Sequence, residues 1–349
     1  MKLQTVANRV WKEMTGKHDN NWGMNIENWD WVPGVGVIAL LEYYESSGDP
    51  EVLVFLTEWV ARNKHKAEET RVINSIAPYA VFPALYRLTG DEWLKEEAVR
   101  IADWLLKEAP KTREQALEHT VTEKADFSEQ VWADTIFMAV LFLARTAKLV
   151  ENKSYAEEAL KQVLIHLRLL NDKEHHVLFH GWNCNSGDHM SGARWTRANA
   201  WIAAGVPLIV KEIAPLIAIP DELGQRYGCL LAGLVSFQQK DGLWSTVMDQ
   251  PGFYREISGS AGIAYGLQIA MEQGLVDASP VYESAAERAL QAILPYISEA
   301  GVVDGVSGGT PVMDSVEAYN RIPVYPALYG QGLVLMLLAK APGRKESQE

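Results

Sequence analysis

Helical segments of two kinds alternate along this chain, and this alternation restricts the fold more than any other feature. Some segments carry one apolar stripe with charged residues between its members, as in Leu94, Ala98, Ile101 and Leu105. Others are apolar on nearly every side. These lie at 34–43, 77–88, 135–144, 198–210, 261–270 and 328–339. The pattern predicts six buried inner helices, each covered by an amphipathic outer helix.

Turn-forming residues separate each inner segment from the outer segment after it, as in SSGDP at 46–50. The sixth inner segment has no outer partner after it, but an N-terminal apolar stripe formed by Leu3, Val6, Ala7, Val10 and Met14 can supply one. The hairpins then close into an all-α toroid within one domain at 1–341, followed by a polar tail at 342–349. An open helical solenoid is the alternative. A parallel α/β sheet is a weaker choice because strand-like alternation is scarce.

The composition excludes several classes of partner. The formal charge of −13 over 349 residues argues against nucleic acid and against an anionic membrane surface, because both require a basic face. The N-terminus lacks the apolar stretch of a signal peptide, and no later segment has the length of a membrane span. Cys184 and Cys229 are too few for a disulfide framework, so a cytoplasmic location is expected. The oligomeric state is left open.

Residues unlike core residues gather just before the apolar helices or in their first turns. They include Trp31, Asn74 and the segments 130–134, 195–197, 256–258 and 323–329. If the inner helices run parallel, as a ring of hairpins requires, these groups converge on one mouth. Helix N-termini carry partial positive charge and free N–H groups, so this mouth favours an anion such as a carboxylate.

Asp134 is the candidate catalytic residue. Position alone also fits a structural carboxylate in an early helical turn, where the helix dipole stabilises it. Its neighbours Trp132, Ile136, Phe137 and Met138 are apolar or aromatic, and a low-dielectric setting raises the pKa of a carboxyl group toward the range useful for general acid catalysis. We therefore expect Asp134 to have a raised pKa and to act as the acid.

Trp195, Arg197 and Trp201 lie within one run, RWTRANAW, at 194–201. In a helix Arg197 and Trp201 are four residues apart and share a face. They could pack in the core, with the arginine head reaching solvent. Tryptophan faces also stack on sugar rings, however, and the guanidinium fork of arginine matches a carboxylate. The run therefore predicts a binding surface for an acidic sugar.

Two histidines, His119 and His180, lie in irregular polar stretches, where a lone histidine is more often a structural hydrogen-bonding residue than a catalyst. His175, His176 and His189 do not form a metal-ligand spacing with a carboxylate, so no metal site is predicted. The chain also has no glycine-rich phosphate loop. We expect no cofactor.

Four motifs together resemble glycoside hydrolase family 105, the unsaturated rhamnogalacturonyl hydrolases. They are QVWADTIFMA at 130–139, FHGW at 179–182, WTRANAW at 195–201 and YGQG at 329–332. The resemblance runs in order over nearly the whole chain. It implies an (α/α)6 barrel and an exo-acting hydrolase. Such an enzyme removes a 4,5-unsaturated uronic acid from the non-reducing end of small acidic oligosaccharides produced by lyases.

The resemblance also implies a mechanism that differs from the usual scheme with two carboxylates. Asp134 would protonate C4 of the double bond and help to deliver water to C5, and the resulting hemiketal would open and expel the remaining sugar. The binding residues that it implies are stacking walls at Trp132, Trp195 and Trp201, Arg197 facing the uronate carboxylate, the hydrogen-bonding His119 and His180, and more loosely Trp31.

Asn74 departs from the pattern of the family, because better-known members carry an aspartate at this position before the second inner helix. Asparagine cannot ionise, so a second acid or base is lost there, although Asn74 can still orient a hydroxyl group. The spacing from His119 to Asp134 is also longer than in those members. The range of substrates could differ accordingly.

Two other functions fit parts of the sequence. A sugar epimerase or isomerase on a similar barrel would depend on proton transfer by His119 and His180. A non-catalytic oligosaccharide-binding protein would use Asp134 only as a hydrogen-bond acceptor. The residues around Asp134 favour the hydrolase, because they give the aspartate the central position.

Overall fold

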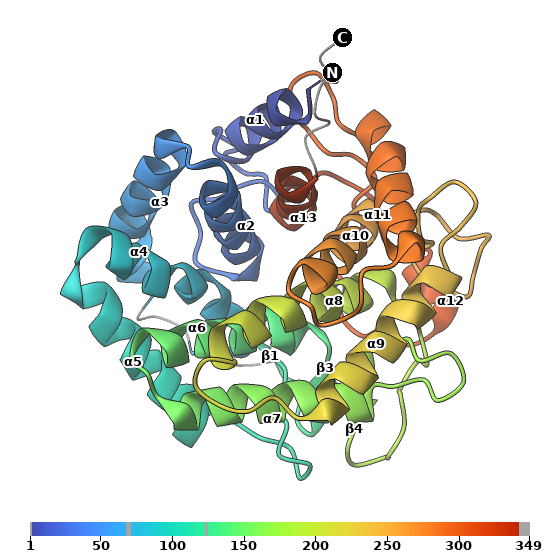
Figure 1. Cartoon of the computed structure of the whole chain (residues 1–349), viewed down its shortest axis with the longest axis horizontal. Coiled ribbons are helices and arrows are strands. Elements are labelled where there is room, and N and C mark those ends of the chain that lie inside the picture. The colour runs from blue at the N-terminus through green and yellow to red at the C-terminus, as the bar shows by residue number, and fades with distance from the viewer. Residues whose placement is uncertain (1, 68–70, 123–124, 342–349) are drawn as a thin grey trace.

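The chain folds into a ring of inner helices surrounded by outer helices. The structure, a computed structural model, describes residues 2–67, 71–122 and 125–341. The outer helices are α1 (Leu3–Met14), α3 (Pro50–Asn63), α5 (Glu92–Lys107), α7 (Lys153–Leu169), α9 (Asp221–Ser236) and α11 (Pro280–Ile293). Figure 1 shows them at the periphery, with α2, α8, α10 and α13 nearer the centre. The predicted (α/α)6 barrel is therefore confirmed.

The inner ring is made of elements from all six predicted apolar segments. They are α2 (Trp31–Ser47), η2 (Ile73–Val81) with α4 (Phe82–Thr89), η3 (Ile136–Val140) with α6 (Leu141–Leu149), α8 (Thr196–Ile213), α10 (Ile257–Glu272) and α13 (Leu328–Lys340). Neighbouring inner elements pack against each other, and α13 packs back on α2, so the ring closes. The N-terminal helix α1 covers α13, as its apolar stripe predicted.

The ends of the helices follow local sequence signals. α2 ends before Gly48 and α4 ends before Gly90, and both glycines adopt the left-handed conformation, with φ of 67° and 72°. The side chains of Asp49 and Asp91 then accept hydrogen bonds from the first turns of α3 and α5. The predicted hairpin turns therefore form as expected.

Two inner helices are less regular than the sequence predicted. The second begins as the 3₁₀ helix η2, which contains Pro78, a residue without the N–H that a continuous α-helix needs. The third begins with the π-helical turn η3 directly after Asp134 and Thr135. Extra residues in a helical turn are common at functional sites. Both irregular elements lie at the N-terminal ends of inner helices.

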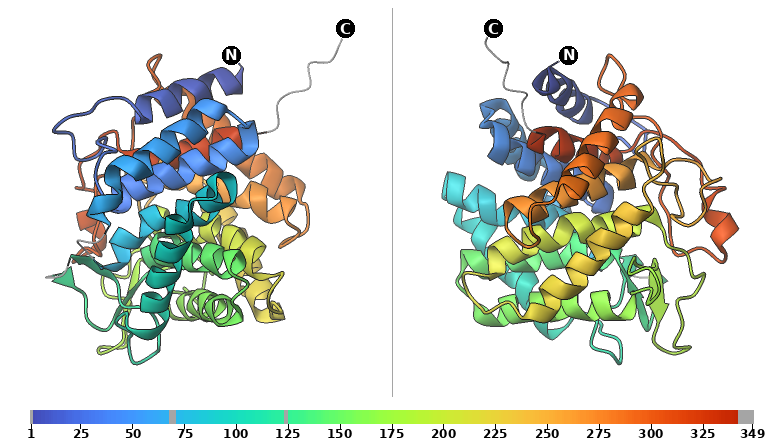
Figure 2. Two further views of the ribbon diagram at one scale, coloured as in Figure 1. Left: turned by 90° about the vertical axis from the view of Figure 1, so that its left-hand side faces the viewer. Right: turned by 45° about the vertical axis from the view of Figure 1, so that its right-hand side comes forward.

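Short strands, which the sequence did not predict, occur in the loops. The strand β1 (Thr120–Thr122) pairs with β2 (Ala125–Asp126), and β3 (Gln130–Trp132) pairs antiparallel with β4 (Gly181–Asn183). The remaining elements are η1 (Lys64–Lys66), η4 (Leu294–Tyr296) and α12 (Val316–Tyr319). Both views in Figure 2 show the orange-red helix α12 at one side of the barrel, among loops.

None of the helices within the described ranges is long and apolar enough to cross a bilayer. The division into one domain at 1–341 and a tail at 342–349 stays a prediction, and the tail lies outside the described residues.

A buried ion pair joins inner helices near their C-terminal ends. The guanidinium of Arg145 in α6 donates to the carboxylate of Glu42 in α2 and, 3.0 Å away, to the carbonyl of Ala80 in η2. Tyr265 in α10 donates to the second oxygen of Glu42 at 3.2 Å. Burial raises the pKa of Glu42, although Arg145 opposes this shift. The Glu42 carboxylate therefore connects α2, α6 and α10, and Arg145 adds η2 to them.

We expect Arg145→Met to lower the free energy of unfolding by about 3–5 kcal/mol, because it leaves Glu42 buried without its cation. The double variant Glu42→Gln/Arg145→Met should recover part of this loss. Urea unfolding measures both effects. In the control Arg168→Met, which breaks an exposed pair with Glu222, the loss should stay within about 1 kcal/mol. Equal losses in the two single variants would contradict the connecting role of Arg145.

Candidate active site

Asp134 and His180 meet because two short strands pair. β3 ends at Trp132, which lies opposite Gly181 in β4. Beyond this pair, the backbone N–H of Ala133 donates to the carbonyl of His180 at 3.1 Å. The antiparallel ladder thus continues by one residue and places Ala133 opposite His180. Asp134 is the next residue after Ala133, and its side chain lies next to that of His180.

Both carboxylate oxygens of Asp134 have a nitrogen partner. The Nε1–H of Trp201 in α8 donates to Oδ1 at 3.1 Å, and Nε2 of His180 lies 3.2 Å from Oδ2. The Asp134 side chain keeps 14% of its surface exposed, whereas His180 and Trp201 are buried. A ligand at the mouth can therefore reach the carboxyl group, and the protein holds that group from behind.

The raised pKa expected for Asp134 is wrong for the unliganded protein. Burial does act to raise the pKa, but the hydrogen bond to His180 opposes it. The charge of Arg197 acts in the same direction, and the net pKa lies below its ordinary value. The apolar neighbours in sequence did not reveal these partners, which come from other parts of the chain. Asp134 is therefore ionised near neutral pH.

His180 links Asp134 to a distant loop. Its Nδ1 lies 2.7 Å from the hydroxyl of Tyr319, the last residue of α12. The ring packs on Trp195 at 4.2 Å and on Trp132 at 5.5 Å between centroids. Burial lowers the pKa of His180 although Asp134 opposes this shift, so the imidazole is neutral near neutral pH.

His119 supports the site from beneath Trp132. Their rings stack with centroids 4.5 Å apart and planes at 15°, and Nδ1 of His119 lies 3.1 Å from the hydroxyl of Thr135. Burial lowers the pKa of His119 to about 4, so it is neutral near neutral pH. His119 and His180 both pack on the ring of Trp132, at 4.5 and 5.5 Å between centroids.

Arg197 is buried and has many protein partners. Its Nη1 donates to the carbonyl of Ser307 at 2.8 Å and its Nη2 to the carbonyl of Gly308 at 2.8 Å. The carboxylate of Glu256 lies 3.7 Å away. The guanidinium also lies 4.6 Å from the ring of Tyr329. The predicted contact with a substrate carboxylate stays a prediction, because these groups occupy both terminal nitrogens of Arg197 here.

The tryptophans predicted as stacking walls have different surroundings. Trp201 is fully buried, with its ring against Phe137 at 5.0 Å, so its role here is the hydrogen bond to Asp134. Trp132 and Trp195 are also buried, on either side of His180. Trp31 is half-buried and stacks on Tyr329 at 4.8 Å. Among these four, Trp31 offers the most accessible ring to a ligand.

The starts of the inner helices do converge on one mouth. Contacts run from Trp31 at the start of α2 through Tyr329 in α13 to Arg197 in α8 and Glu256 before α10. Asn74, at the start of η2, is buried, and its Oδ1 has no hydrogen-bond partner in the described structure. The structure therefore leaves one buried acceptor unsatisfied at this helix start.

Two helix N-termini at this mouth already carry a carboxylate of the protein. Glu256 accepts from the backbone N–H of Gly259 at 2.6 Å in α10, and Asp30 accepts from that of Trp31 at 2.8 Å in α2. The side chains of Glu256 and Asp30 are therefore the N-caps of α10 and α2. The predicted attraction of a substrate anion to free helix N-termini therefore does not apply to α2 and α10.

Sequence reasoning missed Tyr319, Glu256 as an ion-pair partner, and Ser307. Glu256 was grouped with the helix starts, but nothing in the sequence pairs it with Arg197. Tyr319 and Ser307 lie in irregular segments without a recognisable motif, and Tyr319 is 139 residues from His180. Only the folded chain brings these residues together.

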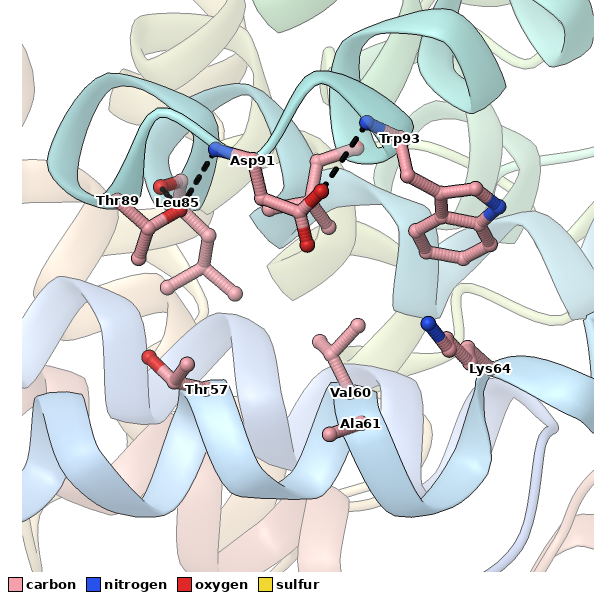
Figure 3. Close-up of a pocket in the computed structure, with 9 residues that line it drawn as sticks. Thr57, Val60, Ala61, Lys64, Leu85, Thr89, Asp91 and Trp93 are labelled. Carbon is pink, nitrogen blue, oxygen red and sulfur yellow. Dashed lines mark hydrogen bonds between the residues drawn. The ribbon is translucent and has the colours of Figure 1, made fainter.

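Figure 3 shows a pocket between α3, α4 and α5 whose lining does not include the residues that contact Asp134. Two of its polar side chains form hydrogen bonds at helix ends. Thr89 donates to the carbonyl of Leu85 at the end of α4, and Asp91 accepts from the backbone N–H of Trp93 at the start of α5. Within the described ranges, no three His, Cys, Asp or Glu residues are grouped so that they could hold a metal ion. The candidate site is therefore the mouth around Asp134.

Comparison with known sequences gives the family. The family described as Glycosyl Hydrolase Family 88 matches residues 4–342. The unsaturated rhamnogalacturonyl hydrolase YesR of Bacillus subtilis is 34% identical over 318 residues, which are 89% of this chain and 89% of that protein.

Comparison with solved structures agrees. A possible member of the GH105 family from Salmonella enterica superposes with a TM-score of 0.90 at 28% identity, covering 97% of this chain and 93% of that one. The unsaturated glucuronyl hydrolase of Bacillus sp. GL1 has a TM-score of 0.75 at 17% identity, covering 96% of both chains, and shows the shared fold.

The hydrogen bond from Trp201 gives a test of the ionisation of Asp134. We expect Trp201→Phe to raise the pKa of the Asp134 carboxyl, because the ionised form loses a donor. Carbon-13 NMR of the carboxyl group, with Asp134→Asn to assign the signal, measures this pKa. Trp244→Phe is the control, since its indole N–H donates to the carbonyl of Leu234 and not to Asp134. An unchanged or lower pKa in Trp201→Phe would show that the bond does not stabilise the carboxylate.

Proposed function

Because this chain matches the family 88 glycoside hydrolases and, among them, belongs with family 105 by its similarity to YesR and to a possible GH105 member, we propose that it removes a 4,5-unsaturated uronic acid from the non-reducing end of lyase-generated oligosaccharides. The observation that carries this proposal is the carboxyl group of Asp134, which is open to the mouth and held from behind by Trp201 and His180. Hydration of an enol ether needs one group that gives a proton and then takes one back, and Asp134 is placed to do both.

In the first step, protonated Asp134 gives its proton to C4 of the substrate, and positive charge develops at C5 and the ring oxygen. The proton leaves behind a carboxylate whose two oxygens are already paired with Trp201 and His180. Because these bonds favour the charged form, they make Asp134 a stronger acid. A stronger acid is better suited to protonating carbon, which is a weak base.

In the second step, water attacks C5 and the Asp134 carboxylate accepts its proton. Water is thus added across the double bond, with hydrogen on C4 and hydroxyl on C5, and the acid is regenerated. The hemiketal then opens and expels the remaining sugar. One carboxyl group completes the cycle, so the chemistry does not need a second acid at Asn74.

We infer that Asn74 serves binding by accepting a hydrogen bond from a sugar hydroxyl at Oδ1, which is buried and has no partner in the described structure. Half-buried Trp31 can pack on an apolar sugar face. We place the uronate beside Asp134, within the mouth that also contains His180, Trp195 and Arg197.

Rhamnose is the proposed leaving sugar, which would place the enzyme in the degradation of pectin. The support is the similarity to a Bacillus subtilis protein named as an unsaturated rhamnogalacturonyl hydrolase. A cytoplasmic location stays a prediction that rests on the two cysteines. Cys184 and Cys229 are both unpaired in the structure.

Activity is tested with unsaturated disaccharides made by a rhamnogalacturonan lyase. The wild type should abolish the ultraviolet absorbance of the conjugated double bond, and Asp134→Asn should lower kcat by about 10²–10⁴-fold because it removes the proton donor. Binding of the disaccharide and the melting temperature should change little in this variant. No loss of absorbance with any galacturonyl or glucuronyl unsaturated disaccharide would refute the proposed function, and an active Asp134→Asn would assign the acid elsewhere.

The pH dependence follows from the lowered pKa of Asp134. Above that pKa the protonated fraction of the free enzyme falls about tenfold per pH unit, so kcat/KM should decrease as pH rises from 5 to 8. Initial rates at low substrate concentration measure this profile. In Trp201→Phe the decrease should begin at higher pH. A kcat/KM that increases with pH over this range would be incompatible with Asp134 as the acid.

A further inference from the structure

We propose that Tyr319 fixes the tautomer of His180, so that the imidazole always presents Nε2–H to Asp134. Tyr319 is then a positioning residue that acts on the acid through His180. This inference rests on the proposed function for its catalytic consequence, but the tautomer itself can be measured without any substrate.

The hydrogen bonds at the phenol oxygen of Tyr319 determine where its proton points. The backbone N–H of Met313 donates to this oxygen at 3.2 Å, and a backbone N–H can only donate. The hydroxyl group of Ser191 has no hydrogen-bond partner in the described structure, so it does not compete for the phenol proton. The remaining partner of the phenol oxygen is Nδ1 of His180 at 2.7 Å. The O–H of Tyr319 is therefore the donor in this contact.

The accepting Nδ1 fixes the state of His180. A neutral imidazole carries one proton, so if Nδ1 accepts, Nε2 carries the hydrogen. Nε2 lies 3.2 Å from Oδ2 of Asp134. The charged groups that act on His180 are Asp134, which favours its protonation, and Arg197, which opposes it. The nearby His119 is buried and neutral. Tyr319 therefore adds a local preference for the neutral Nε2–H form.

This tautomer matters when Asp134 is protonated. If Nε2 lacked a hydrogen, it would accept the proton or a hydrogen bond from the Asp134 carboxyl group. The catalytic proton would then point toward His180 and away from C4 of the substrate. With Nε2–H directed at Asp134, His180 can only donate, so the proton of Asp134 stays available at the open side. The tautomer thus determines whether Asp134 can serve as the acid.

Tyr319 is suited to hold this position. It is fully buried, and burial raises its pKa to about 12, so the phenol keeps its proton. Arg197 binds the same loop at Gly308 and Thr310. The loop also packs closely on Gly181, where a Cβ would lie 2.8 Å from Cγ2 of Val312. A rigid loop can therefore hold the phenol oxygen at hydrogen-bonding distance from His180.

The test is Tyr319→Phe, which keeps the ring contacts with His180 and Trp195 but removes the hydroxyl. We expect kcat to fall about 10- to 100-fold with KM changed less than about threefold, because the acid is misdirected while the binding surface is kept. The pKa of His180, followed by NMR, should rise because the neutral form loses its donor. Unchanged kcat and unchanged His180 pKa would overturn the proposal.

A double-mutant cycle shows whether Tyr319 acts through His180. In a His180→Asn background, adding Tyr319→Phe should cause no further loss of kcat beyond about twofold, because the two residues act as a unit. The same 10- to 100-fold loss in that background would assign Tyr319 a merely structural role. Tyr155→Phe is the control: it removes an outer hydroxyl that donates to Asp103 and should retain wild-type kcat.

Long-range proton–nitrogen NMR of the wild type with labelled histidine gives an answer even if Tyr319→Phe does not fold. We expect His180 to show a protonated Nε2 and an unprotonated Nδ1 near neutral pH. A proton on Nδ1 would overturn the proposal directly. If the wild type shows the expected tautomer but hydrolyses no unsaturated uronide, the proposed function fails while the role of Tyr319 in fixing the tautomer stands.

Discussion

The buried pair of Arg197 and Glu256 holds the mouth of the barrel together. Arg197 lies in the first turn of α8, and Glu256 directly precedes α10. Both residues also bind Ser307 in the loop before α13. Arg197 donates to its carbonyl, and Glu256 accepts from its backbone N–H. Burying two charges is costly unless their remaining hydrogen-bonding groups are satisfied. Here the first turn of α10 and the loop at Ser307 and Gly308 supply most of the hydrogen-bond partners, while Nε of Arg197 has none in the described structure. The pair therefore forms only when these segments are correctly assembled.

The geometry of the candidate site depends on this assembly. The loop bound by Arg197 and Glu256 continues to Met313 and α12, which bring the phenol of Tyr319 to His180. The pairing of β3 with β4 fixes His180 beside Asp134 from the other direction. Precise placement of a reacting group requires support from rigid neighbours. The barrel provides that support by closing its ring of inner helices around the site, with Glu42 and Arg145 as a second buried ion pair.

Most of the fold could be predicted from the sequence because helical periodicity and turn residues are local signals. The stripe from Leu3 to Met14 predicted that α1 closes the ring, and Gly48 and Gly90 marked helix ends. The irregular starts at Pro78 and after Thr135 were not predicted, since the apolar pattern of an inner helix is the same whether its first turn is α, 3₁₀ or π. The β3–β4 pairing was missed because strands of three residues leave no usable alternation.

The site was predicted less completely, because the state of a carboxyl group depends on partners that are distant in sequence. The motif singled out Asp134, but its donors His180 and Trp201 lie 46 and 67 residues away. Trp201 was expected to face a sugar, and instead donates to the acid. The expected contact of Arg197 with a substrate carboxylate stays a prediction, and in this structure its terminal nitrogens donate to the protein. In each case the residue type indicated that the residue belongs to the site. The orientation of its side chain depended on packing that the sequence does not show.

A lowered pKa is compatible with acid catalysis when the substrate is an anion. A uronate bound in the mouth adds a negative charge close to Asp134, and a nearby like charge raises the pKa of a carboxyl group. Substrate binding would then favour uptake of the proton that Asp134 transfers to C4 in the first step, while the bonds from Trp201 and His180 keep the resulting acid strong. A neutral sugar in the same position would not induce this proton uptake. The charge of the substrate would in this way help to determine whether Asp134 is protonated, so selectivity for a uronate and activation of the acid have the same electrostatic origin.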